Sequence, residues 1–218
     1  MKPYYDEAGI TIFHGDCREI LPDLAYDLII TDPPYGISHA SGHGASWQNT
    51  TIQNDHDTSL RDWIMAHDVP MAVFDTWKSP RPAGVRAALV WDKGPASGMG
   101  DLTFPWKGSW ELIWICGDGW HGRRDEGVLR NHFVPPAESQ GRRHPNEKPV
   151  TLIQCLLIKA PEGIVCDPCC GVGTTLIAAR DVGRRAIGIE IEERYCAVAV
   201  KRLGQGVFDF EEPLNADG

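Results

Sequence analysis

The chain has 218 residues, 42% hydrophobic and 23% charged, an ordinary globular composition that fits one sizeable domain and is short for two with a linker. Because no apolar run approaches the roughly 18 residues that span a bilayer, and the start Met1–Glu7 lacks the apolar stretch of a signal peptide, we expect a cytoplasmic protein without a membrane partner. The net charge of −9 argues mildly against a nucleic-acid partner, although a local basic patch can outweigh it.

Short apolar or β-branched runs alternate with helical patterns along the chain. Seven runs are typical of buried strands, at 10–13, 26–31, 70–74, 86–91, 111–116, 164–167 and 185–190. Near-continuous apolarity, as in Leu28-Ile29-Ile30, indicates strands covered on both faces. Helical patterns follow at 59–65, 151–158, 174–181 and 192–203. This alternation predicts an α/β fold with a doubly wound, mostly parallel sheet.

Two stretches fit neither pattern. Gly36 to Asp57 is polar and rich in Gly, Ser, His and Asn, and Gly117 to Asn146 is loop-rich with Pro135-Pro136. Long loops inside compact domains are often functional. The second stretch and the residues just after it concentrate basic side chains, namely Arg123, Arg124, Arg130, Arg142, Arg143 and Lys148. From charge alone, a solvated loop is the simpler interpretation of this region.

The sequence Asp32-Pro33-Pro34-Tyr35 directly follows the second predicted strand. Ligands of open α/β sheets bind beyond the carboxyl ends of strands, so this is the right place for a site. An aromatic amino group is a poor nucleophile because its lone pair is delocalised into the ring. The Asp32 carboxylate and the Pro33 carbonyl, whose direction the fixed φ of proline presets, could accept both of its N–H groups, while Tyr35 could stack on an extruded base. The alternative is a proline-rich turn.

A second motif, Asp167-Pro-Cys-Cys-Gly-Val-Gly-Thr-Thr175, lies between a strand and a helix. Its glycines allow close backbone approach of a ligand, and the helix start offers free N–H groups, as in a nucleotide site. It is neither a complete dinucleotide fingerprint nor a phosphate loop. Glu190 ends the next strand about 20 residues on, where a carboxylate accepts ribose hydroxyls.

The seven cysteines are odd in number, and four of them stand alone in sequence. Cys166 and Cys169 form a CxxC pair, but a zinc site needs a second ligand pair, which the sequence lacks. We therefore expect free thiols and no bound metal.

Together these motifs resemble those of the DNA amino-methyltransferases, which modify N6 of adenine or N4 of cytosine. Asp32 to Tyr35 resembles their catalytic motif, and Asp167 to Thr175 resembles their cofactor motif, with Cys169 in place of the usual Phe and Val172 in place of the usual Ser. Because the catalytic motif precedes the cofactor motif, the chain resembles the circularly permuted β group, whereas protein glutamine methyltransferases normally have the reverse order. The resemblance covers about residues 9–204, and it is weakest over Gly117 to Arg143.

Further segments match the same family. Gly15-Asp16-Cys17 resembles the element that touches the cofactor's adenine, and the segment from His144 to Pro149 resembles the one that places a basic group near the methionine carboxylate. Val90 to Lys93 and Trp110-Glu111 resemble strand motifs of the catalytic domain, and Glu190 with Tyr195 resembles the ribose-binding motif.

The resemblance implies a fold, a cofactor and a set of site residues. The fold would be the seven-stranded methyltransferase sheet with one antiparallel strand, in a single domain over residues 1–218, and the cofactor would be S-adenosylmethionine. The catalytic residues would be Asp32, Pro33, Pro34 and Tyr35. The cofactor-binding residues would be Asp16, Cys17, Asp32, Lys148, Asp167, Pro168, Cys169, Gly171, Gly173, Thr174, Thr175 and Glu190.

The implied reaction is extrusion of a base from double-stranded DNA followed by direct in-line methyl transfer. Family members with Asp before Pro-Pro-Tyr are mostly adenine-N6 enzymes, whereas cytosine-N4 enzymes more often have Ser, so Asp32 favours adenine and leaves cytosine as the alternative. Residues 117–143 form a small candidate target-recognition insertion. DNA contacts are expected from Trp47, Arg123, Arg124, Arg130, Arg142 and Arg143.

Three questions stay open from the sequence. A methyltransferase fold that binds cofactor or nucleic acid without turnover is an alternative of another class, because a fold does not guarantee its chemistry. RNA is a second possible substrate, and the acidic balance of the chain keeps both alternatives open. The oligomeric state could be monomer or homodimer.

Overall fold

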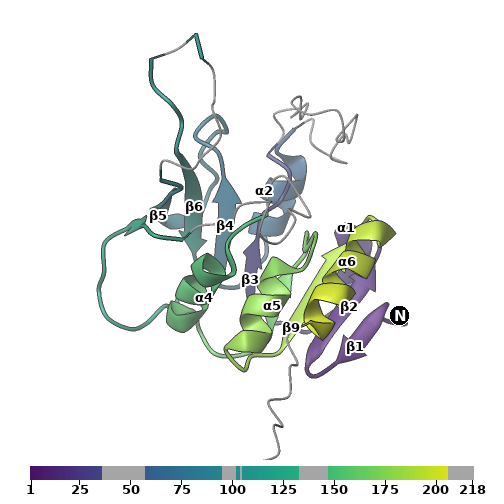
Figure 1. Ribbon diagram of the computed structural model, residues 1–218. Helices are drawn as coiled ribbons and strands as arrows, with labels where there is room; N and C mark the ends of the chain where they lie inside the picture. The colour runs from purple at the N-terminus through teal and green to yellow at the C-terminus, as the bar shows by residue number, and fades with distance from the viewer. Residues whose placement is uncertain (36–56, 95–101, 104, 133–146, 206–218) are drawn as a thin grey trace, which may run out of the picture.

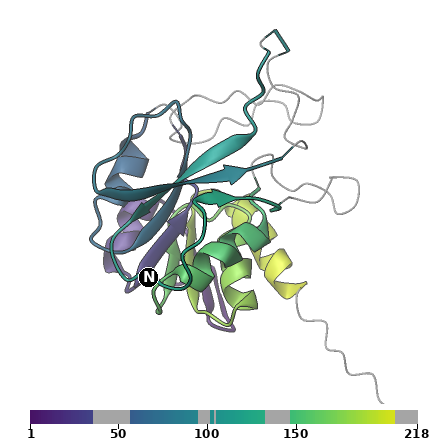
Figure 2. The same ribbon diagram turned by 90° about the vertical axis from the view of Figure 1, so that its left-hand side faces the viewer.

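The computed structural model describes residues 1–35, 57–94, 102–103, 105–132 and 147–205. In this part of the chain a nine-stranded sheet has the order β1-β2-β9-β8-β3-β4-β6-β5-β7, with helices on both faces (Figures 1 and 2). The strands are β1 Tyr5–Glu7, β2 Ile10–His14, β3 Leu28–Thr31, β4 Met71–Asp75, β5 Val85–Asp92, β6 Trp110–Cys116, β7 Val128–Leu129, β8 Val165–Asp167 and β9 Ala186–Glu190. The helices are α1 Cys17–Ile20, η1 Leu21–Asp23, α2 Ser59–Met65, α4 Val150–Lys159, α5 Thr174–Asp181 and α6 Glu193–Gly204.

The predicted α/β fold with a mostly parallel sheet is confirmed, but the expected count of seven strands was too low. All seven predicted strands are present, and β1 and β7 extend the sheet at its two ends. β1 has the polar sequence Tyr-Asp-Glu and β7 has two residues, so neither carries the apolar run by which strands were identified. Strand β6 is antiparallel to both β4 and β5, and β1 is antiparallel to β2.

Alternate strand residues bury two separate apolar layers, one on each face of the sheet. Leu28 and Ile30 pack with residues of α4, α5 and α6, while Ile29 packs with residues of α1, η1 and α2. Because side chains of a strand alternate between faces, a strand apolar at every position requires cover on both. That explains why β3 and β4 are buried throughout.

The five parallel strands from β2 to β4 end at one edge of the sheet, which we call the carboxyl edge. The antiparallel β6 begins at this edge, since Leu112 pairs with Asp75 of β4 and Trp110 with Asp92 of β5. The described part of the β5–β6 connection therefore extends beyond the carboxyl edge, at the upper left of Figure 1. Strand β6 ends at the opposite edge, where Cys116 pairs with Met71 and Val85.

Among the described helices, none is both long and apolar enough to cross a membrane.

Candidate functional site

The predicted catalytic loop lies at the carboxyl edge, directly after the central strand β3. Pro33 is buried, whereas Asp32, Pro34 and Tyr35 are half-buried. The Tyr35 hydroxyl donates to Asp32 Oδ1 at 2.5 Å. Burial, reinforced by the negative charges of Asp32 and Glu111, raises the pKa of Tyr35 well above its usual value. The hydroxyl therefore stays protonated and continues to donate to the carboxylate.

Lys148 is a buried cation that faces this loop from the segment before α4. Its Nζ lies 2.7 Å from Asp32 Oδ2 and 3.1 Å from Glu111 Oε2, and it donates to the Tyr35 hydroxyl at 3.2 Å. Burial acts to lower the pKa of Lys148, but attraction to Asp32 and Glu111 outweighs this and raises it overall. Lys148 therefore stays charged at neutral pH, and both oxygens of Asp32 already accept hydrogen bonds or pair with a cation.

Glu111, on β6, stands between two lysines. It forms ion pairs with Lys93 and with Lys148, and although burial acts to raise its pKa, these two cations lower it overall. Glu111 and Asp32 thus both compensate the charge of Lys148. From the sequence, Val90 to Lys93 and Trp110-Glu111 were identified only as strand motifs. The signal for Glu111 was a carboxylate at the start of a near-continuous apolar strand.

The loop between β8 and α5 is joined to the catalytic loop by a buried hydrogen bond. Thr31 Oγ1 donates to Asp167 Oδ1 at 2.7 Å, and the backbone N–H of Cys169 donates to the same oxygen at 3.1 Å. Burial raises the pKa of Asp167 to about 6, against the opposing hydrogen bonds of Thr175 and Thr31. Asp167 therefore ties together the ends of β3 and β8 and shapes the turn that follows.

The glycines of this turn are required by its backbone. Gly171 and Gly173 have φ of 50° and 78°, in the left-handed region that favours glycine. A Cβ on Gly173 would lie 2.8 Å from Ala199 Cβ, whereas a Cβ on Gly171 would meet no atom within 4 Å. Gly173 is thus needed for packing against α6, and Gly171 faces open space where a ligand could approach the backbone. Pro168, Thr174 and Thr175 are buried around this turn.

Glu190 ends β9 beside this turn, as the sequence predicted. Its Oε2 accepts from the Gly171 N–H and its Oε1 from the Glu192 N–H, both at 2.8 Å. Burial raises the pKa of Glu190. Two backbone donors thus fix the carboxylate in one orientation.

The end of β2 brings Asp16 and Cys17 to the same place. The Gly15 N–H donates to the Glu190 carbonyl at 2.9 Å, and Asp16 caps α1 by accepting from the Arg18 N–H at 2.9 Å. Interaction with the Cys169 thiol lowers the pKa of Cys17. The predicted cofactor residues therefore gather along the carboxyl edge, with Asp32 and Lys148 beside them.

Of the described basic residues predicted to contact DNA, Arg123 and Arg124 do not lie at this edge, whereas Arg130 does. Arg123 and Arg124 follow β6 at the opposite edge, where the Arg123 carbonyl accepts from Lys159 Nζ at 2.5 Å. Arg130 directly follows β7, whose Leu129 pairs with Trp91 near the end of β5; it therefore lies at the carboxyl edge, where it forms an ion pair with Glu126 at 2.8 Å. Trp47, Arg142 and Arg143 lie outside the described residues.

All seven cysteines are free thiols. The described residues contain no group of three or more His, Cys, Asp or Glu side chains that could hold a metal ion.

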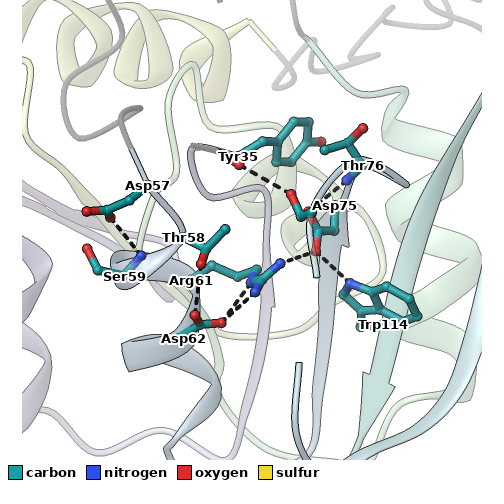
Figure 3. Close-up of polar contacts among 10 residues, drawn as sticks. Tyr35, Asp57, Thr58, Ser59, Arg61, Asp62, Asp75, Thr76 and Trp114 are labelled. Carbon is teal, nitrogen blue, oxygen red and sulfur yellow. Dashed lines mark hydrogen bonds and ion pairs between the residues drawn. The ribbon is translucent and has the colours of Figure 1, made fainter. Parts of the chain in front are cut away.

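A buried ion pair next to the catalytic loop was not predicted (Figure 3). Arg61 Nη1 of α2 lies 2.6 Å from Asp75 Oδ2 at the end of β4, and Trp114 Nε1 donates to the same oxygen at 2.7 Å. Arg61 is 1% exposed and Asp75 is fully buried. The pair anchors α2 to the sheet, and the only sequence signal was an acid at the end of the apolar run 71–74.

Comparisons with known proteins find DNA methyltransferases of similar sequence or fold. The Type II methyltransferase M.ScaI of Streptomyces caespitosus is 25% identical over 93% of this chain and 84% of its own length. The crystal structure of the M1.HpyAVI–SAM complex has a TM-score of 0.62 and 23% identity, covering 88% of this chain and 99% of that one. The structure of the PvuII DNA methyltransferase, described as cytosine-N4-specific, has a TM-score of 0.66 and 17% identity, covering 92% of this chain and 88% of that one.

A sequence model of the N6/N4 DNA methylase family matches residues 90–201. This range contains Glu111, Lys148 and the glycine turn, and it spans slightly more than half of the chain. On these grounds the protein belongs to the N6/N4 family of DNA methylases.

Proposed function

We propose that this protein methylates N6 of adenine in double-stranded DNA, with Asp32 and the Pro33 carbonyl as the groups that hold the amino nitrogen. DNA methylation is the activity of its family. The observation that carries the proposal is the position of Asp32, a carboxylate held between Lys148 and Tyr35 at the carboxyl edge, beside the Glu190 and glycine-turn region.

The chemistry assigned to these residues is recognition of both amino hydrogens. Asp32 accepts one of them and the Pro33 carbonyl accepts the other, which favours a pyramidal nitrogen with an available lone pair. Each carboxylate oxygen has two lone pairs, so Asp32 Oδ1 can accept from the amino group while it still accepts from Tyr35. The Lys148 ammonium pairs with the other carboxylate oxygen, Oδ2, at 2.7 Å. Tyr35 offers its ring to an extruded base.

The residues along the carboxyl edge fit S-adenosylmethionine, which supplies an electrophilic methyl group when bound. The fit rests on the fixed Glu190 carboxylate, suited to two ribose hydroxyls, and on the open space at Gly171. Asp16 and Cys17 would flank the adenine of the cofactor. Lys148 is the buried cation suited to its carboxylate.

Adenine is chosen over cytosine because Asp32, and not Ser, precedes Pro-Pro-Tyr. Both amino groups present similar geometry to Asp32, so the choice rests on this pattern of residues. The likeness to the cytosine-N4-specific PvuII enzyme is one of fold at 17% identity, so cytosine N4 is the outcome against which adenine is tested.

Methyl transfer from labelled S-adenosylmethionine to duplex DNA tests the proposal, with wild type compared with Asp32→Ala. Wild type is expected to label DNA. The variant is expected to lose at least about a hundredfold in rate, as when a transition-state acceptor is removed, while binding cofactor in calorimetry within a few-fold of wild type.

Asp32→Asn is the matched variant, because it keeps the size and one acceptor of the side chain but loses the charge. A wild type that binds cofactor and DNA but transfers no label would identify a binding module. Label transferred to RNA in preference to DNA would reassign the substrate.

A further inference from the structure

An exposed tryptophan lies directly beside the catalytic loop. Trp77 is 63% exposed, two residues after the end of β4 at the carboxyl edge, and the next residue, Lys78, is exposed as well. Tryptophan is highly buried on average and a large apolar side chain in water is unfavourable. Its exposure on this edge suggests a partner that covers it.

The turn that carries Trp77 is fixed at both ends (Figure 3). At its start, Asp75 Oδ1 accepts from the Thr76 N–H at 2.7 Å, while the buried Arg61 and Trp114 hold the other oxygen of Asp75. At its end, the Ser79 N–H donates to the Thr76 carbonyl at 3.2 Å, and Ser79 Oγ donates to the Tyr35 carbonyl at 3.3 Å. The turn is therefore tied both to the sheet and to the catalytic loop.

A second pair of the same kind extends from this edge. Trp106 is 74% exposed and Lys107 is exposed, in the described part of the β5–β6 connection. Strand β6 begins at the carboxyl edge, so Trp106 and Lys107 lie beyond the same edge of the sheet as Trp77. We call Trp77, Lys78, Trp106 and Lys107 the tryptophan–lysine surface.

We infer that the tryptophan–lysine surface contacts the DNA that flanks the target base. This inference rests on the proposed function. An ammonium group next to a flat aromatic ring matches a polyanion whose bases and sugars offer flat and apolar surfaces. A second copy of this chain could cover the indoles, but its net charge of −9 over 218 residues offers the lysines a far lower density of negative charge than the phosphates of DNA do.

The position relative to Asp32 strengthens the assignment. DNA whose base reaches Asp32 must pass over the carboxyl edge, where Trp77 stands within a turn bonded to Tyr35. Arg123 lies at the opposite edge with its carbonyl bonded to Lys159. The surface also lies outside residues 117–143, in which DNA recognition was expected from the sequence.

Fluorescence anisotropy with a labelled duplex, at several salt concentrations, tests the inference with Trp77→Ala/Lys78→Ala and Trp106→Ala/Lys107→Ala. Each double variant is expected to weaken DNA binding about tenfold or more, since one stacked base and one phosphate contact are lost. The salt dependence should become shallower by about one ion per lysine removed. Trp77→Phe should retain most of the affinity because the ring is kept.

The matched control is Ile158→Ala/Arg86→Ala, which removes one exposed apolar and one exposed basic residue away from this surface. Unchanged DNA affinity in Trp77→Ala/Lys78→Ala, or an equal loss in the control, would overturn the inference. The inference would also be overturned if wild type sedimented as a dimer and Trp77→Ala/Lys78→Ala as a monomer with unchanged DNA affinity. The surface would then bind a second copy of the chain.

Affinity and chemistry are read separately. A wild type that methylates cytosine or nothing refutes the proposed function, whereas the anisotropy of the variants decides the tryptophan–lysine surface.

Discussion

At the scale of single residues, the site is a set of charges held out of water. Lys148 is shared by Asp32 and Glu111 at 2.7 and 3.1 Å, and Lys93 pairs with Glu111 from the other side. Removing one partner from such a buried group leaves an uncompensated charge, which is strongly destabilising. Asp32 is therefore held in position by Lys148, the same cation that we propose binds the carboxylate of the cofactor.

The raised pKa of Asp167 predicts how the stability of Asp167→Asn, relative to wild type, depends on pH. The pKa of Asp167 is raised to about 6 in the folded protein, so the native state favours the protonated form and loses stability as the pH rises from the unfolded pKa through the folded one. Asparagine keeps an acceptor for Thr31 and cannot ionise. The free energy of unfolding of Asp167→Asn relative to wild type should increase by about 2 kcal/mol between about pH 4 and about pH 7.

Urea denaturation of both proteins across this pH range measures the difference between their free energies of unfolding. The contributions of the other titrating groups largely cancel in this difference. A difference that stays constant with pH, or that falls as the pH rises, would contradict the assigned state of Asp167.

At the scale of elements, α2 is held to the sheet by a buried ion pair rather than by apolar packing alone. Arg61→Met is expected to lower the free energy of unfolding by about 3–5 kcal/mol, because it leaves the buried Asp75 carboxylate without its cation. Equilibrium urea unfolding followed by tryptophan fluorescence gives this value.

Two variants control the Arg61 prediction. Arg61→Met/Asp75→Asn, which removes the orphaned charge and keeps an acceptor for Trp114, should recover part of the loss. Arg86→Met breaks the exposed ion pair with Asp118 and should matter much less, since exposed pairs are weak. Equal effects of Arg61→Met and Arg86→Met would show that the buried pair does not anchor α2.

The elements also show what the sequence allows one to predict. Apolar runs such as Leu28 to Ile30 identify strands because burial on both faces leaves no polar position. The Gly-x-Gly pattern between a strand and a helix predicted the turn at Gly171 and Gly173, whose backbone is left-handed and would strain other residues. β1 was missed because an edge strand with polar side chains has no such pattern.

Contacts between distant segments were not predictable in the same way. Nothing in the sequence pairs Arg61 with Asp75, or joins Lys93, Glu111 and Lys148, since these contacts depend on how strands are ordered in space. The arginine cluster misled in the opposite way, because closeness in sequence suggested a closeness in space that the fold does not give. Arg123 and Arg130 are close in sequence, but Arg123 follows β6 at the opposite edge, whereas Arg130 follows β7 at the carboxyl edge.

At the scale of the whole molecule, the sheet order brings the two main motifs together. Strands β3 and β8 are parallel neighbours, with Leu28 paired to Val165, so loops that are 136 residues apart meet through the Thr31–Asp167 hydrogen bond. The catalytic loop lies between the cofactor region and the β5–β6 connection. The places proposed for cofactor, base and flanking DNA therefore all lie at one edge of the sheet.

Mass spectrometry of nucleosides from DNA incubated with the protein and S-adenosylmethionine shows whether the methylated atom is N6 of adenine. Wild type is expected to yield N6-methyladenine, and Asp32→Ala is expected to lose it. N4-methylcytosine without N6-methyladenine would contradict the proposed function.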